Sequence, residues 1–240
     1  MRLVRFISSA GICSRRNAAD LIKNNQITVN KRTNNDPAYI VHPTDVVHYK
    51  GKEVKTVVEM VYLMLNKPLG IICASSSPHG EQTVVDLVQD AYAEARLFPI
   101  GRLDKDTTGL ILLTNDGDLA FKLSHPKFNI SKHYRVTLNR QLEFEDEDLL
   151  IKGITLEDGI TAFDDIDIYP NKKNTFDVAL HSGKNRIIRR MFAELEYKII
   201  SLHRFSIGSL HLESLRSGDY RKLSEAEVHE LKAAAEKHQD

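Results

Sequence analysis

Cysteine and tryptophan are the residue types that this sequence uses least. It has two cysteines, Cys13 and Cys73, far apart in the chain, and no tryptophan. Two such cysteines exclude a zinc site of the CxxC type, a disulfide framework and a redox CxxC motif. The ten histidines are scattered, and no two of them combine metal-ligand spacing with a carboxylate partner. We therefore expect reduced thiols, no metal and no cofactor.

Long apolar runs are also absent. No run approaches the roughly 18 residues that a membrane-spanning helix needs. The first residues, Met1–Phe6, lack the apolar stretch and the small-residue cleavage site of a secretory signal. A chain of 240 residues with 28% charged residues is ordinary for one or two globular domains. We expect a cytoplasmic monomer with no membrane partner.

The formal net charge is zero, but the charges are unevenly distributed along the chain. Residues 1–60 contain ten lysines and arginines against five acidic residues, a net charge of +5. Residues 143–167 contain ten acidic residues against Lys152 alone, a net charge of −9. Because a nucleic-acid backbone is attracted to a local basic face, the N-terminal part is the candidate nucleic-acid surface.

Residues 1–58 are predicted to form a small module of two short helices followed by a twisted β-unit. Residues 3–10 carry apolar side chains at helical spacing. Ser14 is predicted to cap a second helix, whose first turn holds the partly exposed pair Arg15 and Arg16. The short strands that follow are separated by predicted turns at residues 30–31 and 50–52.

From residue 59 onward the pattern changes to many strands interrupted by a few helices. The predicted strands are 61–65, 71–73, 97–103, 110–113, 134–138, 176–180 and 205–212. Helices are predicted at 84–88, at 187–195 and after a capping box formed by Ser224 and Glu227. No element is predicted over residues 139–175. Because strands and helices do not alternate regularly, we expect an α+β domain with a mixed sheet over residues 59–240.

The most informative segment is Phe98–Leu110, in which an apolar run leads into Asp104 and Asp106. A glycine and a second apolar run follow, so the pattern predicts a strand, a tight polar loop and another strand. Such a loop would hold a short acidic side chain at the rim of a rigid sheet. A carboxylate held there can act as a nucleophile or a general base.

Two further segments carry candidate reactive groups, Lys132–Val136 and Ser182–Met191. The second places a glycine and basic residues before an apolar helix. Free N–H groups and cationic side chains at a helix start suit phosphate or carboxylate binding. An arginine close to Asp104 would favour the ionised form that a nucleophile requires.

The N-terminal module resembles the small RNA-binding module first described in ribosomal protein S-four. The resemblance is carried by residues 5–16, with their Ala-Gly-Ile-Cys-Ser-Arg-Arg run, and by Ile27–Asn30. It implies that Arg15 and Arg16 contact structured RNA, mainly through phosphates. The alternative is that both arginines are simply solvated residues at a helix start.

Nearly the whole chain resembles the pseudouridine synthases, specifically the bacterial RsuA-type branch that modifies ribosomal RNA, with the RluF- and RluB-like members nearest. The motifs that carry this resemblance are residues 65–70, 101–104, 112–119 and 185–191. It implies a pseudouridine synthase fold with a mixed, mainly antiparallel sheet and no cofactor. One departure is Ile187, which lies where the branch usually has glutamine.

The resemblance also implies roles for individual residues. Asp104 matches the essential aspartate that attacks the target uridine at its ring or its sugar carbon. Tyr134 matches the tyrosine that stacks on the base, and Arg189 matches the basic residue that pairs with the aspartate. Arg102 matches a residue that can fill the gap left by the extruded base. Further RNA contacts are expected from Lys184, Arg186 and Arg190.

The predicted function is conversion of uridine to pseudouridine in ribosomal RNA, with the large subunit favoured over the small subunit or transfer RNA. The partner is then ribosomal RNA or a ribosome assembly intermediate. Two alternatives stay open: a non-catalytic RNA-binding or ribosome-assembly protein, and a hydrolase that uses Asp104 and Asp106 as a carboxylate pair. Taken singly, Asp104 could cap a turn and Tyr134 could fill the sheet.

Overall fold

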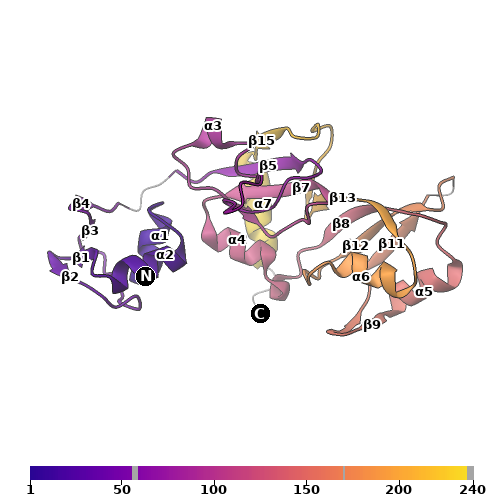
Figure 1. Cartoon of the computed structure of the whole chain (residues 1–240), viewed down its shortest axis with the longest axis horizontal. Helices are drawn as coiled ribbons and strands as arrows, with labels where there is room; N and C mark the ends of the chain where they lie inside the picture. The colour runs from indigo at the N-terminus through magenta and orange to yellow at the C-terminus, as the bar shows by residue number, and fades with distance from the viewer. Residues whose placement is uncertain (56–58, 170, 237–240) are drawn as a thin grey trace. The chain divides into compact units, whose positions relative to one another are not determined.

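The computed structural model describes residues 1–55, 59–169 and 171–236 (Figure 1). The chain divides into two compact units. The first comprises residues 1–61 with 94–96 and 115–117, and the second comprises 62–93, 97–114 and the chain from 118 onward. The predicted boundary after residue 58 falls on residues 56–58, which lie outside the described residues. Within the described ranges, no helix combines the length and apolarity needed to span a membrane.

The first unit holds two helices and a small sheet. The helices are α1 (Leu3–Ser9) and α2 (Arg15–Lys23), and the strands are β1 (Ile27–Val29), β2 (Arg32–Thr33), β3 (Val47–Tyr49) and β4 (Lys52–Glu53). The Oγ of Ser14 accepts a hydrogen bond from the Asn17 amide at 3.1 Å, which confirms the predicted cap. Both predicted turns are present, because the residue pairs 30–31 and 50–51 all have positive φ angles.

The second unit is built on a nine-stranded sheet with the strand order β11-β12-β8-β13-β7-β5-β15, in which β6 pairs with β7 and β14 pairs with β13. The strands are β5 (Tyr62–Lys67), β6 (Phe98–Ile100), β7 (Thr108–Thr114), β8 (Lys132–Leu138), β11 (Asp165–Ile168), β12 (Thr175–Leu180), β13 (Ile199–Ile207), β14 (Leu210–His211) and β15 (Tyr220–Lys222). The β7–β13 pair is parallel and the other pairs of this sheet are antiparallel. The predicted α+β class with a mixed, mainly antiparallel sheet is confirmed.

The remaining elements of the second unit are α3 (Gln89–Tyr92), α4 (Gly117–Ser124), the 3-10 helix η1 (Pro126–Phe128), α5 (Phe144–Lys152), α6 (Ile187–Glu194), α7 (Glu225–Glu236) and the hairpin β9 (Ile154–Leu156) with β10 (Gly159–Thr161). Buried residues of α4 and α7, such as Leu123 and Leu231, share a core with Leu112 of β7. Helix α6 packs Phe192 against Phe176 of β12, with ring centroids 5.7 Å apart. These helices therefore bury the inward side chains of the sheet.

The predicted capping box is confirmed at the start of α7. The Glu227 amide donates to the Ser224 Oγ at 3.2 Å, and the Ser224 amide donates to the Glu227 carboxylate at 2.8 Å. Arg221 also donates to both carboxylate oxygens of Glu227, which lowers the pKa of this glutamate to about 2. The box thus satisfies backbone donors that a helix start would leave without partners.

Two element predictions are wrong. The predicted strand 71–73 is only an isolated bridge between Ile72 and Thr83. The predicted helix 84–88 is a series of turns, and the helix begins later, at α3. The Thr83 amide donates to Asp86 at 2.8 Å and the Asp86 amide donates back to Thr83 at 3.2 Å. These local side-chain bonds offer the backbone an alternative to the helix ladder.

Gly109 lies where β7 and β13 run in parallel, paired with Arg204. Its φ is +106°, and a Cβ added here would lie 2.1 Å from the Arg204 carbonyl oxygen. No side chain fits, because the obstacle is main chain and cannot rotate away. Glycine at this position therefore permits the backbone contact that joins the two halves of the sheet.

Replacing this residue tests the contact. Gly109→Ala should lower the free energy of unfolding by about 3 kcal/mol or more, because backbone strain and overpacking add. Gly218→Ala is the matched control, since Gly218 also has a positive φ, +89°, but nothing within 4 Å of an added Cβ. Its expected cost is the strain alone, about 1–2 kcal/mol. Urea denaturation measures both, and equal losses would contradict the steric explanation.

Candidate active site

Asp104 lies in the loop of the hairpin formed by β6 and β7, as predicted. The two strands pair from Phe98 opposite Thr114 to Ile100 opposite Leu112. The Thr107 amide donates to the Asp104 carbonyl at 3.1 Å, which closes a turn over residues 104–107. The Asp104 side chain is 29% exposed, so it is held at the rim of the sheet and still open to a ligand.

A buried lysine lies beneath this loop. The Nζ of Lys67, at the end of β5, donates to the carbonyls of Thr107 at 2.7 Å, Pro68 at 3.0 Å and Lys105 at 3.4 Å. Burial lowers the pKa of Lys67, while Cys73, Asp106 and Asp104 oppose the shift. These bonds tie both ends of the 104–107 turn to the neighbouring strand.

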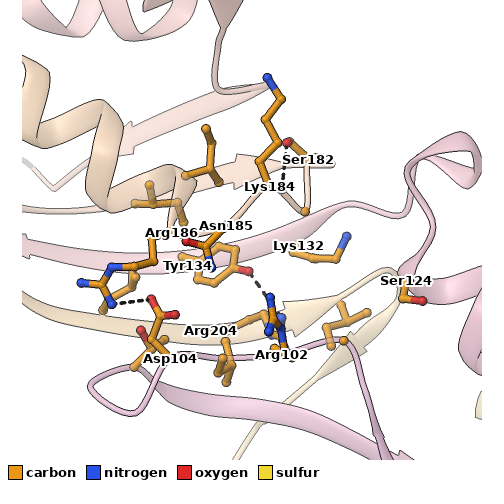
Figure 2. A pocket seen from close by; sticks show the side chains of 18 of the residues that line it. Arg102, Asp104, Ser124, Lys132, Tyr134, Ser182, Lys184, Asn185, Arg186 and Arg204 are labelled. Carbon is orange, nitrogen blue, oxygen red and sulfur yellow. Dashed lines mark hydrogen bonds and ion pairs between the residues drawn. The ribbon is translucent and has the colours of Figure 1, made fainter. Parts of the chain in front are cut away.

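Two arginines face Asp104 from the start of α6. Arg186 Nη1 lies 3.2 Å and Arg189 Nε lies 3.6 Å from the same Asp104 oxygen. The predicted pairing of Arg189 with Asp104 thus corresponds to a close approach, and Arg186 comes closer still. Arg186 itself is the N-cap of α6 and has a φ of +47°. This conformation turns its side chain toward the loop that carries Asp104 (Figure 2).

Asp106 shares both arginines. Its carboxylate lies 3.1 Å from Arg189 Nη2 and 3.6 Å from Arg186 Nη1. Arg189 also donates to the Asp106 carbonyl at 3.0 Å and to Thr107 Oγ1 at 3.2 Å. Because the Asp106 side chain is 53% exposed and the Arg189 side chain only 15%, the arginine is the fixed member of the group. Asp106 is therefore held by ion pairs with both arginines and is not simply a solvated loop residue.

A pocket of about 200 Å³ opens beside Asp104. Six of the predicted site residues line it: Asp104, Tyr134, Arg189, Arg102, Lys184 and Arg186. Tyr134 comes from β8, is 9% exposed, and directs its hydroxyl toward Arg204 (Figure 2). The pocket thus combines one carboxylate, one aromatic ring and several cations, a set suited to a flat base joined to a phosphate backbone.

The other predicted residues lie elsewhere. Arg190 donates to both carboxylate oxygens of Asp158, at 2.9 and 3.0 Å, and does not line the pocket. Arg190 as an RNA contact stays a prediction, at a position beside Asp158 and outside the pocket. Arg15 and Arg16 are exposed in the first turn of α2, in the other unit. Lys184 lines the pocket while its Nζ donates to the Asp158 carbonyl at 2.9 Å.

Two basic residues that line the pocket, Lys132 and Arg204, were not predicted as site residues. Lys132 begins the segment Lys132–Val136, which was predicted to carry reactive groups, but the sequence predicted no role for this lysine. Arg204 lies on β13, outside the predicted segments with reactive groups. Its signal is the alternation of β13, since Leu202 and Ser206 are buried at the neighbouring inward positions. An arginine at an inward position of a strand is rare without a function or a partner.

Among the described residues, no group of three or more histidine, cysteine, aspartate or glutamate side chains could hold a metal ion.

Comparisons with known proteins agree with this geometry. Residues 61–194 match the RNA pseudouridylate synthase family, and residues 1–47 match the S4 domain. The chain is 38% identical to "Ribosomal large subunit pseudouridine synthase B" of Bacillus subtilis, over 98% of this chain and 97% of that relative. An uncharacterized RNA pseudouridine synthase of Aquifex aeolicus is 34% identical, over 96% of this chain and 93% of the relative.

A solved structure is also similar over almost its entire length. The crystal structure of a pseudouridylate synthase aligns with a TM-score of 0.70 and 30% sequence identity, covering 96% of this chain and 99% of that one. The family match takes in β5 to α6, and with them Asp104, Tyr134 and Arg189. The chain therefore belongs to the RNA pseudouridylate synthase family, in the RsuA-type branch in which an S4 domain precedes the catalytic domain.

Proposed function

We propose that this RNA pseudouridine synthase converts a specific uridine of ribosomal RNA into pseudouridine, with the large subunit as the favoured substrate. The observation that carries the proposal is the Asp104 carboxylate at the mouth of the pocket, with Arg186 at 3.2 Å and Arg189 at 3.6 Å. The name of the Bacillus subtilis relative supports the choice of large-subunit RNA. Transfer RNA and small-subunit RNA are the other candidates within the same reaction.

The reaction that we propose is an isomerisation and needs no external oxidant or reductant. Asp104 attacks the target uridine, at the ring or at the sugar carbon, and the bond between N1 and C1′ breaks. The uracil then rotates, a bond forms between C5 and C1′, and the bond to Asp104 breaks and returns its electron pair to the carboxylate. The C5 proton is replaced by one on N1. The arginines beside Asp104 place two positive charges next to the attacking carboxylate.

The target base must leave its helix before this chemistry can occur, because a stacked and paired uridine hides its glycosidic bond. Extrusion costs a few kcal/mol, which contacts between basic residues and phosphates can offset. We assign Arg102, Lys184 and Arg186 to the RNA near the pocket, with Arg102 filling the gap left by the base. Tyr134 offers a ring on which the flipped base can stack.

We further propose that the two parts of the chain divide the work. Residues 1–58 bind structured RNA through Arg15 and Arg16, and residues 59–240 carry out the reaction. The protein acts as a cytoplasmic monomer on ribosomal RNA or on an assembly intermediate. The local excess of basic residues in the N-terminal part supports this role.

The alternatives are weaker but testable. A hydrolase with a carboxylate pair needs one carboxyl group that donates a proton, whereas Asp104 and Asp106 both form ion pairs with Arg186 and Arg189. A non-catalytic RNA-binding protein would have no need for Asp104 beside an open pocket. It would bind the same RNA without changing it.

The nucleophile is tested by an isosteric replacement. Asp104→Asn should lower the single-turnover rate of pseudouridine formation by about 10⁴-fold or more, because the amide cannot attack. Chemical mapping of pseudouridine in an unmodified ribosomal RNA transcript measures the rate, and filter binding measures the RNA affinity, which should be retained. Asp106→Asn is the control, because it contacts the same arginines.

We expect the control variant to keep its rate within about tenfold. Full turnover by Asp104→Asn would refute the proposed mechanism. If the protein without substitutions binds the RNA but forms no pseudouridine, the non-catalytic alternative is favoured.

The RNA-binding role of the first unit is tested with the double variant Arg15→Ala and Arg16→Ala. Loss of two phosphate contacts should reduce the slope of log K against log salt by about 1.5 and weaken binding. Lys152→Ala is the control, since this lysine pairs with Asp148 at 2.7 Å inside the acidic helix α5. Affinity and slope equal to those of the control would remove both arginines from the recognition surface.

A further inference from the structure

Arg204 is a buried arginine inside the pocket, with an exposed fraction of only 3%. Its Nε donates to the Leu110 carbonyl at 2.8 Å, and its Nη1 lies 3.4 Å from the Tyr134 hydroxyl. The third nitrogen, Nη2, is buried and has no hydrogen-bond partner within the described chain. The same residues offer Arg204 no carboxylate within ion-pair distance.

Lys132 is a second cation lining the same pocket. Its Nζ donates to the carbonyls of Ile130 at 2.9 Å and His181 at 3.4 Å. The charged groups that face it are Arg204 on β13 and Asp164, which precedes β11. Burial lowers the pKa of Lys132 to about 8; Arg204 adds to the shift, and Asp164 opposes it.

A buried arginine and a half-buried lysine without a paired carboxylate are costly for the fold. Burying a charge without a counter-ion costs several kcal/mol, and a buried donor with no partner adds to that cost. Two other arginines, Arg135 and Arg221, are instead paired with carboxylates, those of Asp177 and Glu227. The unpaired state of Arg204 therefore points to a ligand that supplies acceptor atoms and negative charge.

The chemistry of the proposed reaction identifies such a ligand. When the bond between N1 and C1′ breaks, its electron pair passes to the uracil ring and is delocalised onto O2 and O4. Attack by Asp104 at the ring instead of the sugar likewise places negative charge on a ring oxygen. Uracil thus carries two acceptor oxygens whose charge grows during the reaction. Buried cations aimed at such oxygens stabilise the transition state more than the ground state.

We propose that Arg204 and Lys132 bind the carbonyl oxygens of the flipped uracil and stabilise the negative charge that develops on the ring. The proposal rests on the proposed function and deepens it. Tyr134 then lies against the base, with its hydroxyl held by Arg204. The two donors also select the base, because cytosine presents an amino group where uracil presents O4, and donor would face donor.

Single-turnover kinetics with an unmodified ribosomal RNA transcript that contains the target uridine test the proposal. Arg204→Gln and Lys132→Met should each lower the rate of the chemical step by about 10²–10³-fold, with the RNA dissociation constant within about threefold of the unmodified chain. Arg204→Lys keeps the charge and should retain more of the rate than Arg204→Gln. Should Arg204→Gln fail to fold, Arg204→Lys and Lys132→Met carry the same test.

The matched control is Arg135→Met, next to Tyr134 on β8. Arg135 pairs with Asp177 and does not line the pocket. Its loss should affect stability but leave the chemical rate within about threefold. Equal rates for Arg204→Gln, Lys132→Met and the control would overturn the proposal.

Substrate analogues separate a ligand contact from a structural role. Sulfur is a weaker hydrogen-bond acceptor than oxygen. The chemical step of the protein without substitutions should therefore be slower when the uracil oxygen that Arg204 contacts is replaced by sulfur, in 2-thiouridine or 4-thiouridine. In Arg204→Gln the same analogue should cause no further loss, because the contact is already gone. The assignment of Arg204 is overturned if 2-thiouridine and 4-thiouridine each slow Arg204→Gln by the same factor as they slow the protein without substitutions.

The pH profile tests Lys132. The ammonium loses its proton as the pH rises through about 8, so the rate of the unmodified chain should fall above that pH. Lys132→Arg stays charged and should hold its rate at pH 9, whereas an identical alkaline fall would remove Lys132 from the charge-stabilising pair.

Failure of the proposed function and failure of this inference give different results. A protein without substitutions that forms no pseudouridine overturns the proposed function. An active chain whose variants keep full chemical rates overturns only the role of Arg204 and Lys132.

Discussion

The backbone contact between β7 and β13 at Gly109 is the constraint on which the site depends. It joins the half of the sheet that carries the Asp104 loop to the half that carries Tyr134 and Arg204. A side chain at this position would overlap the Arg204 carbonyl oxygen. The pocket therefore exists where the two halves meet, with Asp104 from one half and Tyr134 and Arg204 from the other.

The charged side chains at the rim of the pocket and those deeper inside it have different kinds of partner. At the rim, Asp104 and Asp106 share Arg186 and Arg189, so each of these four side chains has a neighbour of opposite charge. Deeper in, Lys132 and Arg204 have carbonyl and hydroxyl partners instead. The rim thus holds its carboxylates in ion pairs. The interior is arranged to receive a ligand that becomes negative.

Local patterns in the sequence predicted most of the architecture correctly. The Ser14 cap, the hairpin around Asp104 and the helix α6 each depend on residues close together in the chain. The wrong predictions also have local causes, because the reciprocal bonds of Thr83 and Asp86 compete with a helix that apolar spacing alone favours. The acidic segment 139–175 holds α5, β9, β10 and β11, which no pattern revealed.

The sequence by itself determined the chemistry: a strand–loop–strand segment around Asp104, an aromatic strand residue at Tyr134 and a basic helix start. Only the tertiary structure decided which cations serve the carboxylate. Arg186, Arg189 and Arg190 are nearly adjacent in the chain, but the first two face Asp104 and the third faces Asp158. The tertiary structure also decided that Arg204 lies in the pocket, 100 residues after Asp104. Spacing along a helix or a strand specifies a face, whereas the pairing of distant strands specifies what that face meets.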